Sequence, residues 1–168
     1  ALESGDSLRA FDFVGFSLGY EMAYTNVLNM LDLAGLPLRS EERRDLAPLV
    51  VAGGTCAYNP EPLAPFVDFF VLGEGEEVTL EYIALYRRAR DEDWTKEELL
   101  REAARIPGIY VPSFYEVSYH EDGTIAAFTP KCPEAPATVR KRLVLDMDKA
   151  YYPTEIPVPY TEIVHDRI

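Results

Sequence analysis

LVVAGG, at residues 49–54, is an apolar run that ends on two glycines. A second apolar run, VDFFVL at residues 67–72, ends on GEGEE at residues 73–77. Short runs rich in β-branched and aromatic residues, bounded by glycine, predict strands that are buried on both faces. Two such strands predict parallel neighbours whose C-terminal loops meet at one edge of a sheet. In open α/β sheets this edge is where ligands bind, and glycines there let a backbone come close.

The succession of strand, glycine and helix continues on either side of these runs. Residues 11–18 predict a strand, and the spacing of apolar residues predicts helices over residues 20–34 and 76–90. We therefore expect an α/β domain, Rossmann-like or flavodoxin-like, with a parallel sheet and flanking helices. The side chains expected to line the buried side of the first helix are Met22, Val27, Met30, Leu31 and Ala34.

A third helix is predicted by a capping sequence. Thr95 is followed three residues later by Glu98, which is the spacing of a capping box. We expect a short helix from Thr95 to about Arg105, closed by Pro107 and Gly108.

The sequence changes in character after residue 107. Residues 109–112, 114–120 and 125–129 predict strands, residues 121–124 predict a hairpin turn, and residues 139–145 predict one more strand. The parts expected are an α/β domain over residues 1–107, a small antiparallel β appendage over residues 108–145, and a linker over residues 146–168, with residues 158–168 extended.

Composition excludes several classes of function. The net charge of −13 argues against binding to nucleic acid or to an anionic membrane, because phosphate binding needs clustered lysine and arginine. There is no apolar run of about 18 residues and no signal-peptide pattern, so we expect a cytoplasmic protein without a membrane span. The two cysteines, Cys56 and Cys132, lie far apart and predict neither a disulfide framework nor a metal site.

Two glycine-containing loops are the candidate binding residues. Gly53, Gly54 and Thr55 suit contact with the phosphate or nucleotide tail of a ligand through backbone N–H groups, or a tight turn with positive φ. The loop is neither a P-loop nor a GxGxxG fingerprint. In the second loop the carboxylates suit hydroxyls, amides or a cation, or simply cap a helix dipole. That second loop consists of Gly73, Glu74, Gly75 and Glu76.

No catalytic constellation accompanies these loops. His120 precedes the hairpin turn and His165 lies near the end of the chain, and neither has a partner expected for a metal site or a catalytic triad. We expect this segment alone to have no catalytic activity.

Three motifs carry a resemblance to a known family. They are SLGYEMAYTNVLNMLDLAG at residues 17–35, VAGGTCAYNPEP at residues 51–62 and LGEGEE at residues 72–77. In this order they resemble the cobalamin-binding-like N-terminal region of a family of uncharacterised radical S-adenosylmethionine (SAM) proteins. Residues 151–154 and 161–168 are similar to the segment that leads into the radical SAM barrel of that family.

The resemblance implies cofactors and a partner. The parent protein is expected to be an enzyme with an iron–sulfur cluster and SAM. The cluster-binding CxxxCxxC triad, absent from this chain, would lie just beyond Ile168, and the first strand of the sheet would lie before Ala1. The expected partner is the radical SAM domain of the same polypeptide. In cobalamin-dependent relatives the strand-end loops face the cofactor, which carries over to Ser17, Leu18, Gly53, Gly54, Thr55, Gly73, Glu74, Gly75 and Glu76.

Two functions follow from this resemblance. In the first, the segment cradles cobalamin on its strand ends, without a histidine ligand, since the Asp-x-His-x-x-Gly motif is absent. In the second, it is a degenerate structural or interaction module that packs on the radical SAM domain and binds no cobalamin. The glycine loops favour the first function, and the missing histidine motif favours the second.

Overall fold

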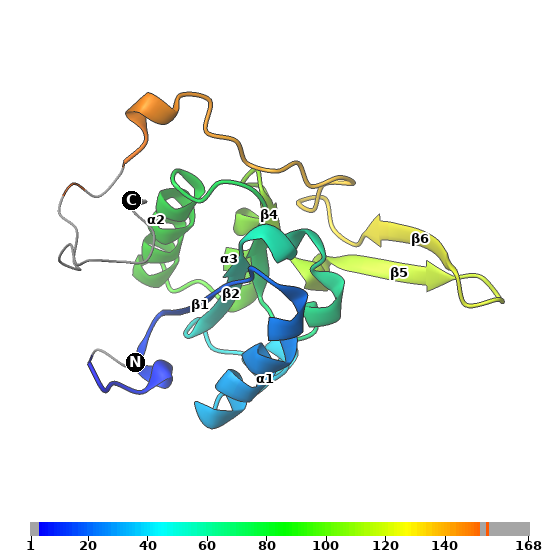
Figure 1. The fold of residues 1–168 in the computed structure, drawn as a ribbon, viewed down its shortest axis with the longest axis horizontal. Helices are drawn as coiled ribbons and strands as arrows, with labels where there is room; N and C mark the ends of the chain where they lie inside the picture. The colour runs from blue at the N-terminus through cyan, green and yellow to red at the C-terminus, as the bar shows by residue number, and fades with distance from the viewer. Residues whose placement is uncertain (1–3, 152–153, 155–168) are drawn as a thin grey trace, which may run out of the picture.

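The computed structural model describes residues 4–151 and residue 154, and its centre is a four-stranded sheet (Figure 1). The strands lie in the order β1-β2-β3-β4, and β2 pairs in parallel with both β1 and β3. This confirms the α/β class and the parallel pairing predicted for the two glycine-ended runs. The bounds are β1 Phe13–Ser17, β2 Leu49–Gly53, β3 Phe69–Val71 and β4 Ile109–Tyr110.

Strand β4 lies in the main sheet, whereas we expected it in the appendage. It pairs antiparallel with β3, with Tyr110 opposite Phe70. The backbone N–H of Leu72 donates to the Gly108 carbonyl at 2.7 Å and extends this pairing. A two-residue strand carries no local signal of its partner. The domain boundary expected between residues 107 and 108 stays a prediction.

Within the described residues three α-helices flank the sheet, and α1 and α2 lie to either side of β1 and β2 in Figure 1. Helix α3 begins with the predicted capping box: the Glu98 N–H donates to Thr95 Oγ1, and the Thr95 N–H donates to the Glu98 carboxylate. The helices are α1 Tyr24–Leu33, α2 Val78–Asp91 and α3 Lys96–Ala103. Short 3₁₀ turns occur at Leu8–Ala10, Glu21–Ala23, Ser40–Glu42, Thr55–Tyr58, Glu61–Leu63, Pro112–Phe114 and Met147–Lys149.

The buried side of α1 differs in part from the prediction. Tyr24, Val27 and Leu31 are buried, whereas Met22 and Met30 are 73% and 49% exposed. The chain first makes a 3₁₀ turn, so the α-helix begins four residues later than expected, at Tyr24 and not Tyr20. Tyr24 therefore occupies the buried position that we had assigned to Met22.

The hydrophobic core is centred on β2 and β3. Leu49, Val50 and Phe70 have no exposed surface, as expected for strands buried on both faces. On one face Phe69 packs edge-on against Tyr82 of α2, with ring centroids 5.4 Å apart. Full burial of these strands fixes the position of the loops at their C-terminal ends.

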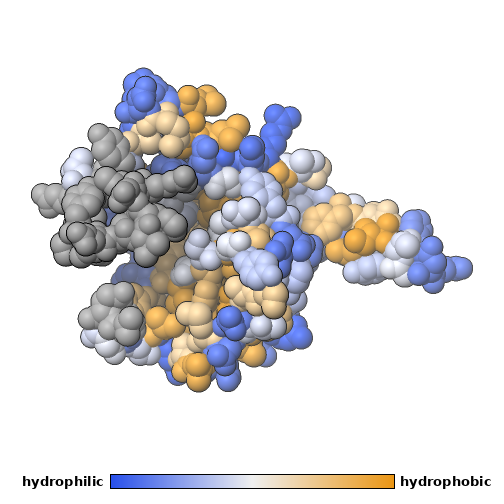
Figure 2. Space-filling view, in the orientation of Figure 1, coloured by the Kyte–Doolittle hydropathy of each residue, from blue (hydrophilic) through white to orange (hydrophobic). Residues whose placement is uncertain are grey.

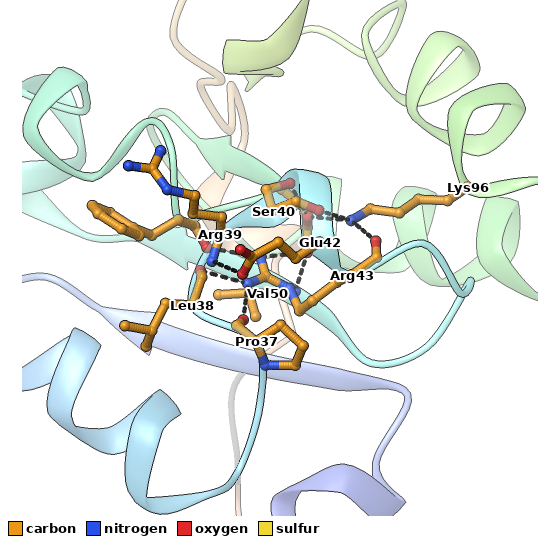
Figure 3. Close-up of polar contacts among 10 residues, drawn as sticks. Pro37, Leu38, Arg39, Ser40, Glu42, Arg43, Val50 and Lys96 are labelled. Carbon is orange, nitrogen blue, oxygen red and sulfur yellow. Dashed lines mark hydrogen bonds and ion pairs between the residues drawn. The ribbon is translucent and has the colours of Figure 1, made fainter.

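A buried ionic cluster holds the segment between α1 and β2 against the sheet (Figure 3). Asp68 lies just before β3 and is 1% exposed. Its carboxylate pairs with Lys96 Nζ at 2.6 Å and with the Arg43 guanidinium at 3.2 Å, and it accepts from the Val50 N–H at 2.7 Å and from Ser40 Oγ. Figure 3 shows Arg43 and Lys96 converging on this cluster from two separate segments.

The predicted hairpin is confirmed as a separate two-stranded antiparallel sheet. Its strands are β5 Tyr115–Tyr119 and β6 Ile125–Pro130. The hairpin projects from the body of the molecule (Figure 1).

The strand predicted over residues 139–145 is wrong. In the part of the chain that the structure describes, this segment forms one isolated parallel bridge, between Arg142 and Gly73. Strand β3 already pairs with β2 on one side and β4 on the other, so the segment can bond only beyond the end of β3. We call residues 139–149 the strap. Of the linker expected over residues 146–168, residues 152–153 and 155–168 lie outside the described residues.

Candidate functional site at the ends of the strands

The three predicted loops lie together at the C-terminal edge of the sheet. Ser17 is in register with Gly53, and the Leu18 N–H donates to the Gly53 carbonyl at 2.7 Å. A Cβ built on Gly53 would lie 3.6 Å from the Val71 carbonyl oxygen, at the end of β3. Parallel pairing therefore brings together residues that are far apart in the sequence.

Gly54 lets two loops of the chain approach each other. It has a φ of +93°, and a Cβ at this position would lie 2.9 Å from both the backbone N and the O of Leu18. The Cys56 N–H donates to the Leu18 carbonyl at 2.8 Å and closes the contact. Glycine is needed here for positive φ and for the approach of Leu18, which itself is 2% exposed. Thr55, the next residue, is exposed.

Gly73 lets the strap approach the sheet. Its φ is +102°, and a Cβ would lie 2.7 Å from the backbone N of Arg142 and still closer to its carbonyl oxygen. The Arg142 N–H donates to the Leu72 carbonyl at 2.8 Å, and the Glu74 N–H donates to the Arg142 carbonyl at 3.1 Å. The strap therefore fills the space in front of Gly73.

The acidic residues of this loop have separate surroundings. The Glu74 carboxylate accepts a hydrogen bond from the Val144 N–H of the strap. Glu76 is exposed. Gly75 does not have positive φ, and the nearest atom to a Cβ there would be Thr79 Oγ1 at 3.5 Å. Gly75 and Gly53 would thus accept a Cβ in ordinary van der Waals contact, whereas Gly54 and Gly73 would not.

A tyrosine joins the start of α1 to the loop after β2. The Tyr24 hydroxyl donates to the carbonyls of Cys56 and Asn59, at 2.8 and 2.9 Å. Burial, followed by a hydrogen bond with Glu21, raises the pKa of the Cys56 thiol. A raised pKa favours the protonated thiol over the thiolate, which is the nucleophilic form.

These contacts do not fit a cobalamin cradle built on Gly54 and Gly73. In such a cradle the missing side chains would leave room for the cofactor, but the room is taken by the backbone of Leu18 and of Arg142. His120 is exposed on the hairpin, and His165 lies outside the described residues. Residues 4–151 and 154 contain no group of histidine, cysteine or acidic side chains that could hold a metal ion. The assignment of cofactor contacts to the nine loop residues stays a prediction.

A cleft of about 910 Å³ lies away from these loops. Its lining includes Arg39, Arg44 and Lys131, and also Arg43 and Lys96 of the buried cluster, but none of the nine loop residues. Sequence reasoning missed the cluster. The one signal for it was an aspartate within the otherwise apolar run VDFFVL.

The comparisons with known proteins agree with the motifs. A family model described as "Radical SAM proteins, N-terminal" matches residues 1–112. No curated protein and no solved structure matches the chain. Within the described residues, no helix has the length and apolar character to cross a membrane. The chain belongs to the family of radical SAM proteins, of which it carries the N-terminal region.

Proposed function

We propose that this region is a structural module that packs on the radical SAM domain of the same polypeptide and binds no cobalamin. Family membership implies that domain, together with its iron–sulfur cluster and SAM, in the parent protein. The region would hold its own fold and present a fixed surface to the catalytic domain. The chemical steps of the enzyme would then take place in the radical SAM domain.

The observation that carries this proposal is that the strand-end glycines accommodate the chain itself. Gly54 admits the backbone of Leu18, and Gly73 admits the backbone of Arg142. The strap thereby takes the place that a ligand holds in open α/β sheets, at the carboxyl ends of the strands. A corrinoid that contacted Gly73 would first have to displace the strap and break the hydrogen bonds of Arg142 with Leu72 and Glu74.

One observation favours the cradle instead, because Gly75 leaves room for an approaching group. The two functions are separated by titrating hydroxocobalamin into the intact parent protein and following its visible spectrum. We expect no saturable change.

Glycine variants make this titration decisive. Gly75→Val would block a cradle that uses the room at Gly75, whereas Gly15→Val is a matched control in β1, where a Cβ meets nothing within 4 Å. Saturable binding that Gly75→Val abolishes and Gly15→Val preserves would overturn the proposal and establish the cradle.

A further inference from the structure

The inner side of the strap is fixed to the sheet and to α2. The Arg142 guanidinium pairs with Glu77 at 2.7 Å and with Glu81 at 2.6 Å, and its side chain is 18% exposed. The backbone of Arg142 bonds to Leu72 and Glu74. The strap is therefore a docked part of the fold, held by both its backbone and its side chains.

The strap exposes three large apolar side chains among charged ones. Leu143, Leu145 and Met147 are 47%, 93% and 56% exposed. The backbone N–H of Val144, between the two leucines, donates to the Glu74 carboxylate and holds this part of the strap against the body. In Figure 2 hydrophobic colour lies between hydrophilic groups on the part of the surface that the strap forms in Figure 1. Apolar side chains that gather on one exposed surface mark an interaction site more often than scattered ones do.

We propose that Leu143, Leu145 and Met147 form the contact surface for the radical SAM domain of the same polypeptide. This inference rests on the proposed function and names the surface through which it acts. The family match is to an N-terminal region, so the catalytic domain follows it along the chain, and in sequence the strap lies between the matched residues 1–112 and that domain. A domain of the same polypeptide meets such a surface at an effective concentration that the linker sets, about millimolar for a short flexible one. A linker of that kind would favour this domain over a second copy of the protein at micromolar concentration.

Contact at this surface would also affect the edge of the sheet on which the strap lies. Contact on the outer side would press the strap onto Gly73 and onto the ion pairs of Arg142 with α2. The catalytic domain would then rest on the sheet edge through the strap, in the direction from which a ligand would otherwise enter.

Amine cross-linking of the intact parent protein, mapped by mass spectrometry, tests this surface. Lys141 and Lys149 flank the apolar stripe and are exposed, whereas Lys131 lies beside the end of β6. We expect cross-links from Lys141 or Lys149 to the radical SAM domain. Links to that domain only from Lys131 would overturn the surface but keep the proposed function. Links between two copies, or no link between the domains, would overturn both.

A matched pair of variants makes the test specific. The double variant Leu145→Ser/Met147→Ser removes two exposed apolar side chains from the strap. The control Met30→Ser/Leu33→Ser removes the same two residue types from α1, where they are 49% and 79% exposed. We expect the strap variant to lower the yield of interdomain cross-links about tenfold, and the control to leave it unchanged. Equal yields in the two variants would overturn the proposed surface.

Discussion

At the scale of single residues, Asp68 joins three parts of the chain that no local pattern connects. Its carboxylate contacts Arg43, Val50 and Lys96, from the segment before β2, from β2 itself and from α3. Burial lowers the pKa of Lys96, against the opposing effect of Asp68. The paired charge of Asp68 is therefore what keeps two desolvated cations in place.

Replacing Asp68 leaves both cations without a counterion. We expect Asp68→Asn to lower the free energy of unfolding by about 3–5 kcal/mol, the usual cost of removing one partner from a buried ion pair. Denaturant unfolding followed by circular dichroism measures this loss. The control is Glu102→Gln, which breaks an exposed pair with Arg105 and should cost at most about 1 kcal/mol. Similar losses in the two variants would show that the buried cluster does not stabilise the fold.

Gly54 shows how far a residue can be predicted from its neighbours. A tight turn with positive φ was one of the two explanations of the glycine pair, and Gly54 has this conformation. The sequence could not tell which atoms come close to it. The backbone of Leu18 reaches Gly54 only because β1 and β2 pair in parallel, and such contacts are set by the tertiary fold.

At the scale of elements, strong local signals predicted strands and helices well. The parallel strands β1, β2 and β3, the capping box at Thr95 and the hairpin all follow from short-range patterns. The partner of β4 and the path of the strap did not follow, because both depend on which edges of β3 are left free. That is decided by the assembled sheet and not by the sequence of either segment.

The hairpin is an amphipathic ribbon with little cover. Val117 and Tyr119 alternate with polar residues in β5 and pair with Phe128 and Ile125 of β6. Tyr119, Ile125 and Phe128 are exposed by 64%, 63% and 40%. Only its base is packed, where the rings of Tyr115 and Phe128 stack with centroids 5.1 Å apart. An isolated two-stranded hairpin is marginally stable in water, so its stability depends on this base.

We therefore expect the hairpin to open locally while the sheet stays closed. In hydrogen exchange, amides of β5 and β6 should exchange at least about tenfold faster than those of β2. Phe128→Ala should accelerate exchange in the hairpin further and leave β2 unchanged, since the stacked pair lies at the base. Exchange measured by mass spectrometry on peptides from the two regions tests this. Equal protection, or a simultaneous effect on β2, would mean that the hairpin and the sheet unfold as one unit.

At the scale of the whole molecule, buried tyrosines connect segments that are distant in sequence. Tyr24 donates to carbonyls after β2, Tyr86 to the Asp12 carboxylate, Tyr110 to Glu61, and Tyr115 to the Pro136 carbonyl. Burial is the main cause that raises the pKa of each phenol. The folded state therefore holds these groups in their neutral form in a chain whose net charge is already −13.

This arrangement predicts loss of stability in alkali. Burial and the hydrogen bond to Asp12 raise the pKa of Tyr86 to about 12, from an ordinary value of 10.0. Below a pH of about 10 the phenol is protonated in both states, and its full contribution is present. Above that pH the unfolded chain releases the proton first, so the free energy of unfolding falls until the pH passes about 12.

The variant Tyr86→Phe tests how much this one phenol contributes to the free energy of unfolding and to its fall in alkali. At about pH 8 it should be less stable than the parent chain, by about 1.5–3 kcal/mol for a lost bond to a charged acceptor. Between about pH 10 and pH 12 its stability should fall less steeply, because one group no longer titrates differently in the two states.

Tyr119→Phe is the control, since that side chain is 64% exposed. Denaturant unfolding at a series of pH values, followed by the fluorescence of the single tryptophan, Trp94, gives the slopes. If Tyr86→Phe and Tyr119→Phe fall with the same slope, the phenol of Tyr86 is not held neutral by the fold, and the alkaline loss comes from the accumulated negative charge of the chain.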